Sequence, residues 1–251
     1  MDKLIFTMSW DDGSKSDLRL AELLAKYSIE STFYIPQRNI EGISVIDEHE
    51  IRLISQTCEI GGHSLDHIRL NKLSPEEQNY QVSQSKDWLE NVIGEQIYGF
   101  CYPGGKYNSI TIKAVRKAGY YYARTTENFQ TEIIDKFQMP TTMQFYGHNS
   151  HILYLNMLKS HNRLTKFANY FSAVSANKLS QRLEIILYKA IESNQKYLHI
   201  WGHSWELDQL NMWGELENFL KLVQQNSGSI VFKTNYQCAI ASNETKISKI
   251  I

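Results

Sequence analysis

Short apolar runs alternate along this chain with longer stretches in which apolar residues recur every three or four positions. The short runs are typical of buried strands, and the longer pattern is typical of helices. The runs predict strands over Leu4–Trp10, Ser31–Ile35, Thr57–Gly61, Ile97–Tyr102, Tyr120–Thr125, Phe137–Pro140, Tyr197–Trp201 and Ser229–Lys233. The longer pattern predicts helices over Asp17–Tyr27, Asp47–Gln56, Pro75–Val92, Ile110–Ala118, Leu179–Ser193 and Gly214–Gln225. This alternation is typical of a parallel sheet or barrel.

The helix predicted after Ser74 has the clearest start. Ser74 is a suitable N-cap, Pro75 suits the first helical position, and Glu77 completes a capping box.

One region departs from the strand–helix pattern. Between Pro140 and Ser193 the sequence carries helical-looking segments rich in Leu, Asn and Lys without a clear strand signal. We expect a helical insertion, at about residues 146–193, packed on a barrel. A chain of 251 residues with 42% hydrophobic residues can bury one core, so a single domain over residues 1–251 is expected. The tail over residues 242–251 is expected to fray.

Charge and cysteine content narrow the class of protein. The net charge is −1, and the sequence has no cluster of Lys or Arg that would form a positively charged surface for nucleic acid or an anionic membrane. The three cysteines, Cys58, Cys101 and Cys238, lack C-x-x-C spacing, so neither a disulfide framework nor a thiolate zinc site is indicated.

The start of the chain carries no signal-peptide pattern. Residues 1–3 lead directly into the first predicted strand, which favours a cytoplasmic location. No run of eighteen apolar residues occurs, so no membrane span is expected. The oligomeric state is not indicated.

Two polar motifs follow predicted strands. Asp11-Asp12-Gly13 alone is typical of a turn, and His63 with His67 alone is compatible with hydrogen-bonded or solvent-facing histidines. Both motifs would open at the same edge of a parallel sheet. Two imidazoles and a carboxylate leave metal positions open for water and substrate, as catalytic zinc requires, so the pair of motifs favours a hydrolase.

Four sequence blocks together resemble a known family. They are Ile5–Gly13 (IFTMSWDDG), His63–His67 (HSLDH), Phe100–Gly105 (FCYPGG) and Trp201–Ser204 (WGHS). In this order they resemble the motifs of the polysaccharide deacetylases, the NodB-homology or carbohydrate esterase family 4. The resemblance covers residues 4 to about 208. It implies an α/β fold, a distorted (β/α) barrel of seven or eight mostly parallel strands.

The resemblance also implies roles for individual residues. Asp12, His63 and His67 correspond to the ligands of a divalent metal, with Zn²⁺ expected. Asp11 corresponds to the general base, and the Gly104 backbone N–H to the donor that stabilises the oxyanion. Taken alone, the Pro103-Gly104-Gly105 segment is more typical of an ordinary strand-exit turn.

The general acid has two candidates. His199 lies inside a predicted strand, where a buried, hydrogen-bonded histidine is the ordinary interpretation. His203 follows Gly202 at the strand end, where catalytic groups of a barrel collect. His203 is therefore the expected acid, with His199 as the alternative.

The sequence departs from the family pattern at two places. Cys101 stands where many members have an arginine, and no D-x-x-D-W motif occurs. In the family these groups orient the general base and tune its pKa. Their absence here leaves open what controls the pKa of Asp11. Arg124 is a candidate replacement, and an ordinary ion-paired arginine is the alternative.

Several further residues are candidates for binding substrate, although core packing is the alternative for the aromatic ones. They are Tyr102, Pro103, Arg124, Trp205 and His148. The expected activity is metal-dependent removal of an acetyl group, N-acetyl in preference to O-acetyl, from a carbohydrate or glycan precursor. The alternatives are a hydrolase of a small non-sugar amide and a degenerate member that binds glycans without turnover.

Overall fold

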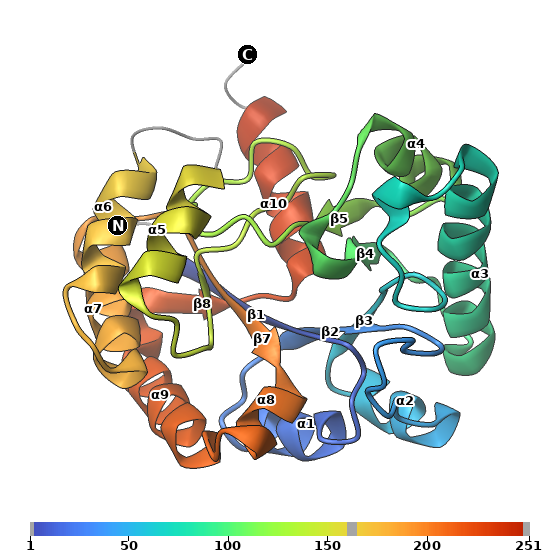
Figure 1. The fold of residues 1–251 in the computed structure, drawn as a ribbon. Coiled ribbons are helices and arrows are strands. Elements are labelled where there is room, and N and C mark those ends of the chain that lie inside the picture. The colour runs from blue at the N-terminus through green and yellow to red at the C-terminus, as the bar shows by residue number, and fades with distance from the viewer. Residues whose placement is uncertain (1–2, 160–164, 248–251) are drawn as a thin grey trace.

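A computed structural model describes residues 3–159 and 165–247 and shows one curled, eight-stranded sheet (Figure 1). The strand order is β5-β4-β3-β2-β1-β7-β6, β8 pairs with β1, and each pairing is parallel. The strands are β1 Leu4–Asp11, β2 Ser31–Ile35, β3 Glu59–Gly62, β4 Gly99–Cys101, β5 Tyr122–Arg124, β6 Met143–Gln144, β7 Tyr197–His203 and β8 Ile230–Phe232. The predicted distorted barrel of parallel strands is confirmed.

Strand β1 is the centre of the sheet. β7 pairs with it from Ile5 to Asp11 along one edge, while the other edge is shared by β8 at Leu4–Phe6 and β2 at Met8–Asp11. Both edges of β1 are therefore hydrogen-bonded, and seven of its eight residues are buried, including the polar Thr7, Ser9 and Asp11. The register places Asp11 beside His203 of β7, so the two motifs meet at the carboxyl end of the sheet.

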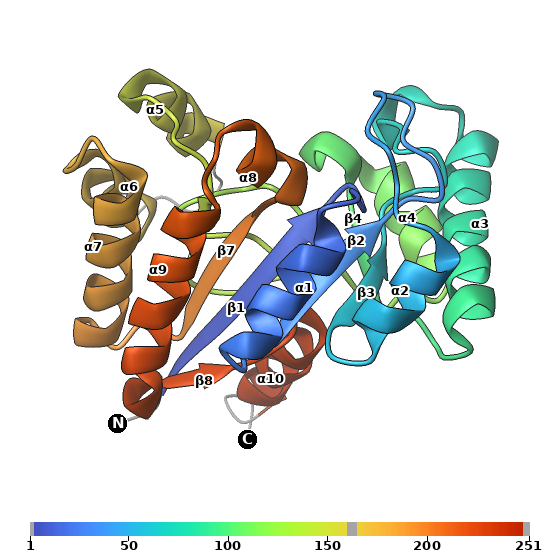
Figure 2. The ribbon, with the colours of Figure 1, turned by 90° about the horizontal axis from the view of Figure 1, so that it is seen from below.

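Helices α1, α2 and α9 lie against the outer face of the sheet (Figure 2). The helices are α1 Asp17–Lys26, α2 Glu48–Ser55, α3 Pro75–Ile93, α4 Ser109–Lys117, α5 Ser150–Lys159, α6 Thr165–Val174, α7 Leu179–Glu192, α8 Ser204–Gln209, α9 Trp213–Gln225 and α10 Asn235–Ile247. The predicted capping box of α3 is present, because Ser74 accepts from the Glu77 N–H and Glu77 accepts from the Ser74 N–H.

Helix α10 covers a second, smaller apolar cluster inside the curl of the sheet. Cys238 and Ala239 pack there with Tyr34, Tyr122 and other buried residues. The sequence analysis predicted neither α10 nor α8. The residues from Ser242 to Ile247, expected to fray, continue α10, and the rest of that expectation, residues 248–251, lies outside the described residues.

The strand predicted at Phe137–Pro140 is misplaced. Met139 forms only an isolated parallel bridge with Arg124 of β5, and the strand β6 begins at Met143 beside β7. Pro140 has no N–H to donate to a ladder, and the chain crosses from β5 to β7 at this point. The Phe137–Pro140 segment therefore connects β5 with the β6–β7 side of the sheet without forming a regular strand.

The region expected as an insertion carries α5, α6 and α7. α5 and α6 pack against each other, and α7 leads into β7. Within residues 3–159 and 165–247, no helix is both long enough and apolar enough to cross a membrane.

Candidate active site

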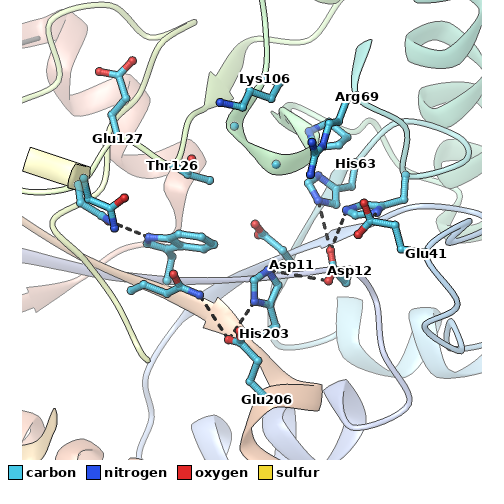
Figure 3. A pocket seen from close by; sticks show the side chains of 18 of the residues that line it. Asp11, Asp12, Glu41, His63, Arg69, Lys106, Thr126, Glu127, His203 and Glu206 are labelled. Carbon is cyan, nitrogen blue, oxygen red and sulfur yellow. Dashed lines mark hydrogen bonds and ion pairs between the residues drawn. The ribbon is translucent and has the colours of Figure 1, made fainter. Parts of the chain in front are cut away.

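Asp12, His63 and His67 come together at the carboxyl end of the sheet (Figure 3). Asp12 Oδ1 lies 3.0 Å from His67 Nε2 and 3.6 Å from His63 Nε2, and the ligand atoms of all three residues lie within 4.8 Å of one another. All three side chains are buried. Two imidazole nitrogens and one carboxylate oxygen converging in this way form a donor set suited to Zn²⁺ and similar divalent metals.

Hydrogen bonds orient these groups toward one another. His63 Nδ1 lies 2.9 Å from the Cys101 carbonyl oxygen, which can only accept, so Nδ1 carries a hydrogen and Nε2 is the ring atom that faces Asp12. Trp205 Nε1 donates to Asp12 Oδ2 at 2.9 Å, which leaves Oδ1 directed at the two histidines. His67 Nδ1 lies 3.7 Å from Glu41 Oε2. The arrangement fits a bound divalent metal.

The backbone at this site adopts unusual angles. Asp12, Ser64 and His67 have φ values of 80°, 58° and 53°, in the left-handed region that most residues avoid. Such conformations persist where the surrounding structure requires a particular side-chain direction. Here they turn Asp12 and His67 toward the same point.

The close approach of these groups shifts their pKa values. Burial raises the pKa of Asp12, but hydrogen bonds from His63 and His67 and the charge of His203 outweigh burial, so the pKa falls far below its usual range. Burial lowers the pKa of His67, but the hydrogen bond to Asp12 and the charges of Asp12 and Glu41 outweigh it and raise the pKa overall. Asp12 is therefore a carboxylate across the physiological pH range.

Asp11 contacts Arg124, and its carboxylate also lies within 4.8 Å of a His63 ring nitrogen. Arg124 Nη2 donates to Asp11 Oδ1, and both residues are buried. Burial lowers the pKa of Arg124, but Asp11 and neighbouring groups outweigh it, so the guanidinium stays charged. Cys101 Sγ lies 3.6 Å from Asp11 Oδ2, and burial holds the pKa of that thiol well above its usual value. The position of the family's arginine thus holds a neutral thiol, while Arg124 supplies the charge from β5.

His203 lies on the other side of Asp12. Its Nε2 is 3.8 Å from Asp12 Oδ2, and its Nδ1 is 3.0 Å from Glu206 Oε2, one helical turn further on in α8. Burial lowers the pKa of His203, but Glu206 and Asp12 outweigh it and raise the pKa to about 9. His203 therefore carries a proton at neutral pH.

His199 is separated from the cleft. It lies inside β7, fully buried, with Nε2 2.7 Å from Ser9 Oγ and Nδ1 2.6 Å from the Tyr197 hydroxyl. Burial and the charge of Arg124 hold its pKa well below the usual value. His199 is a neutral core residue, as the ordinary interpretation of its position in a strand predicted.

The turn after β4 brings its backbone to the cleft. The Gly105 and Lys106 N–H groups close this turn by donating to the carbonyls of Tyr102 and Pro103. Gly104 is exposed and adopts φ +59°, which favours glycine. A Cβ at Gly105 would lie 2.0 Å from Thr126 Oγ1, so that position also requires glycine.

These groups line a cleft of about 910 Å³. Its walls include Pro103, Gly104, His148 and Trp205 from the predicted set, and Trp201. Trp201 Nε1 donates to Asn128 Oδ1 at 3.0 Å, and this hydrogen bond holds the indole ring in place in the wall of the cleft.

Two residues proposed for substrate binding do not line the cleft. Tyr102 is fully buried and its hydroxyl donates to the Phe137 carbonyl, so the structure gives it a packing role. Arg124 is buried behind Asp11 and reaches that carboxylate instead of the cleft.

Five charged residues of the cleft were not predicted from the sequence. They are Glu41, Arg69, Lys106, Glu127 and Glu206. Of these residues, only Glu206 could have been predicted from the sequence. It lies three residues after His203, and a helix places residues at that spacing on one face. The others lie on loops whose course the sequence pattern does not reveal.

The curled parallel sheet and its two-histidine, one-carboxylate group define this molecule as an α/β barrel protein with a candidate metal centre. Residues 2–123 match the family model described as polysaccharide deacetylase. This match covers just under half of the chain, and with the site residues it supports the polysaccharide deacetylase family, of the NodB or carbohydrate esterase 4 type.

Two curated relatives each match about half of the chain. "Putative polysaccharide deacetylase YxkH" of Bacillus subtilis is 31% identical over 122 residues, 48% of this chain and 44% of the relative. A peptidoglycan-N-acetylglucosamine deacetylase of Bacillus cereus is 25% identical over 118 residues, 46% of this chain and 54% of the relative. The chain spans about half the length of the curated relatives it matches.

Solved structures show the same fold over nearly the whole chain. A structure described as T48 deacetylase with substrate has a TM-score of 0.58 at 12% identity, covering 96% of this chain and 92% of that one. A family 4 acetyl xylan esterase from Clostridium thermocellum, solved with a cobalt ion, has a TM-score of 0.58 at 13% identity, covering 93% and 89%. At these identities the likeness establishes the fold.

Proposed function

We propose that this protein is a metal-dependent deacetylase that hydrolyses an acetyl group, N-acetyl in preference to O-acetyl, from a carbohydrate or glycan precursor. Residues 1–251 would form its single catalytic domain. The observation that carries the proposal is the convergence of five side chains on one cleft, all of types that this reaction needs. They are Asp11, Asp12, His63, His67 and His203.

Asp12, His63 and His67 would hold the metal, for which we propose Zn²⁺. The donor set supports this choice, because two neutral imidazoles and a carboxylate suit zinc, and hydrogen bonds already orient His63 and Asp12. When bound, the metal supplies Lewis-acid polarisation of the acetyl carbonyl and lowers the pKa of a water molecule.

The remaining roles follow from where each group lies. Asp11 accepts a proton from the attacking water, with its carboxylate held by Arg124. The Gly104 N–H donates to the oxyanion that develops on the acetyl carbonyl. His203, protonated at neutral pH and held by Glu206, donates a proton to the leaving nitrogen or oxygen.

The cleft supports a carbohydrate substrate. Its volume of about 910 Å³ lies near the upper end of the roughly 300–1,000 Å³ typical of small-molecule sites. Trp201, Trp205 and Tyr107 line it and offer aromatic surface to sugar rings. Pro103, Trp205 and His148 remain the proposed substrate contacts, and Arg124 is proposed as a positioning residue for the base. A small non-sugar amide would leave much of this cleft empty.

The experiment that tests the proposal is acetate release from N-acetylglucosamine oligomers by the zinc-loaded protein, with Asp11→Asn compared with wild type. We expect release by the wild type and its loss by about 10²–10⁴-fold in the variant, as for removal of a general base. Binding of the oligomers without acetate release would support a glycan-binding protein instead. Full activity of Asp11→Asn would overturn the proposed mechanism.

A further inference from the structure

A series of side-chain contacts connects the proposed general acid with the helical insertion. His203 Nδ1 lies 3.0 Å from Glu206 Oε2, a contact that Figure 3 marks with a dashed line. The same Glu206 oxygen accepts a hydrogen bond from Gln144 Nε2 at 3.4 Å. Gln144 Oε1 in turn lies 2.8 Å from His148 Nε2. Side chains from β7, α8, β6 and the loop after β6 are thus connected in sequence.

The orientation of the groups in this series follows from its acidic member. A carboxylate can only accept hydrogen bonds, so Gln144 directs its NH₂ group at Glu206 and its oxygen at His148. His148 Nε2 must therefore carry a hydrogen and donate it to that oxygen. Burial lowers the pKa of His148, so its ring is neutral at neutral pH and has this single N–H. Each group has one orientation that suits both of its neighbours.

Helix α7 anchors the far end of the series. Arg182 of α7 is buried, and its guanidinium donates to the carbonyl oxygens of His148 and Ala176. The His148 ring also packs on that of Tyr146, with 4.6 Å between the ring centroids. Because α7 holds the backbone and Tyr146 contacts the ring, His148 has a defined position from which to orient Gln144.

Glu206 requires a partner besides His203 to fix its direction. Its exposed fraction is only 7%, so water contributes little to its orientation. Its contact with His203 Nδ1 is an ion pair whose atoms are not aligned as a hydrogen bond. Attraction between charges depends mainly on their separation, whereas a hydrogen bond also depends on angle. The hydrogen bond from Gln144 is therefore the contact that gives the carboxylate a direction.

We propose that Gln144 and His148 are positioning residues for the general acid, because they orient Glu206 and Glu206 orients His203. With Nδ1 at Glu206, the other ring nitrogen of His203 lies 3.8 Å from Asp12 Oδ2, on the side of the proposed metal site. The inference rests on the proposed function, in which His203 protonates the leaving group. Gln144 and His148 both line the cleft, so a substrate that contacts them also contacts the groups that orient the acid.

The leaving group distinguishes a positioning role from a structural one. When the bond between the acetyl carbon and a sugar nitrogen breaks, His203 gives that nitrogen a proton and the amine leaves neutral. By contrast, 4-nitrophenolate leaves 4-nitrophenyl acetate without needing a proton. Loss of a residue that positions the acid should therefore slow the first reaction and have little effect on the second. Loss of a residue that only stabilises the fold should slow both by the same factor.

The test measures kcat and KM of the zinc-loaded protein on N-acetylglucosamine oligomers and on 4-nitrophenyl acetate. The variants are Gln144→Leu and His148→Ala, and the matched control is Gln138→Leu, whose side chain contacts Asp135 and Tyr107. We expect Gln144→Leu to lower kcat on the oligomers by about 10–100-fold and to keep most of the activity on 4-nitrophenyl acetate. His148→Ala should show the same pattern with a smaller loss, and the control should show no difference between the substrates.

Equal losses on both substrates in Gln144→Leu and His148→Ala would overturn the inference and leave the proposed function standing. Absence of acetate release by the wild type would count against the proposed function instead, and a crystal structure of Gln144→Leu then tests the positioning alone. The Glu206 carboxylate should turn away from His203 Nδ1 in that variant. A contact that stays at 3.0 Å would overturn the positioning role.

Discussion

At the residue scale, the two adjacent carboxylates at the end of β1 have different environments. Asp11 faces Arg124 and Cys101 inside the sheet, whereas Asp12 faces His63 and His67. Neighbouring residues of a strand point to opposite sides, and the positive φ of Asp12 turns its side chain toward the histidines. One dipeptide can thus supply a proton acceptor and a metal ligand.

The contact between Arg124 and Asp11 predicts the effect of removing the arginine. Arg124→Met leaves a buried carboxylate without its partner, which should lower the free energy of unfolding by about 3–5 kcal/mol. Deacetylase kcat should fall more than KM changes. Urea unfolding and steady-state kinetics measure both effects, and Arg124→Lys should recover part of each. Unchanged kcat in a folded Arg124→Met protein would contradict the positioning role.

Glu206 should set the pH range in which His203 is protonated. Glu206 and Asp12 raise the pKa of His203 against the effect of burial, so His203 is protonated below about 9. Glu206→Gln removes a negative charge and should lower that pKa. The alkaline limb of the kcat profile should then move to lower pH, while metal content stays the same. A limb that does not move would show that His203 is not the titrating acid.

At the element scale, the turn over Pro103–Gly105 connects a buried strand with the cleft. β4 ends at Cys101, and two glycines with positive φ bring the backbone to the surface beside His63 and His67. The turn requires glycine at position 104 because of the positive φ, and at position 105 because a side chain there would collide with Thr126.

Gly105→Ala should destabilise the protein. The added Cβ would lie 2.0 Å from Thr126 Oγ1, so the Thr126 side chain must move, and alanine would be strained at a φ of +65°, at a cost of about 1–3 kcal/mol. Gly214→Ala in α9 is the matched control, because nothing lies within 4 Å of its added Cβ and alanine favours helix by about 1 kcal/mol. Thermal unfolding should separate the two variants. Equal melting temperatures would show that the turn tolerates a side chain.

Elements with a strong periodic pattern or a complete set of end signals were predictable from the sequence. β1, β7 and α3 are examples, since long apolar runs and a capping box define them. β6 was misplaced because it is two residues long and its position depends on pairing with β7. α10 was missed because its burial comes from the interior of the curled sheet, which the local pattern does not encode.

At the scale of the whole molecule, parallel strand order explains why residues far apart in sequence form one cleft. β1, β3, β4 and β7 all end at the same edge, so the residues that follow them converge there. Motif residues at strand ends were therefore predictable. Glu41, Arg69 and Lys106 were not, because loops bring them to the cleft.

Metal removal should destabilise the folded protein. An ion that binds the folded state and not the unfolded chain adds about 2.7 kcal/mol at a free concentration 100 times its Kd. Extended dialysis against a chelator should therefore lower the melting temperature, and added Zn²⁺ should restore it. His67→Ala should show a reduced response to both treatments. An identical response of this variant would place the stabilising ion elsewhere.

The most direct test of the central claim is the metal content of the purified protein, measured by elemental mass spectrometry after incubation with Zn²⁺ and desalting. We predict about one ion per chain in the wild type, its loss in His63→Ala, and its retention in His151→Ala, whose exposed imidazole does not line the cleft. Wild-type protein without metal, or His63→Ala with full metal content, would contradict the assignment of Asp12, His63 and His67 as the metal site.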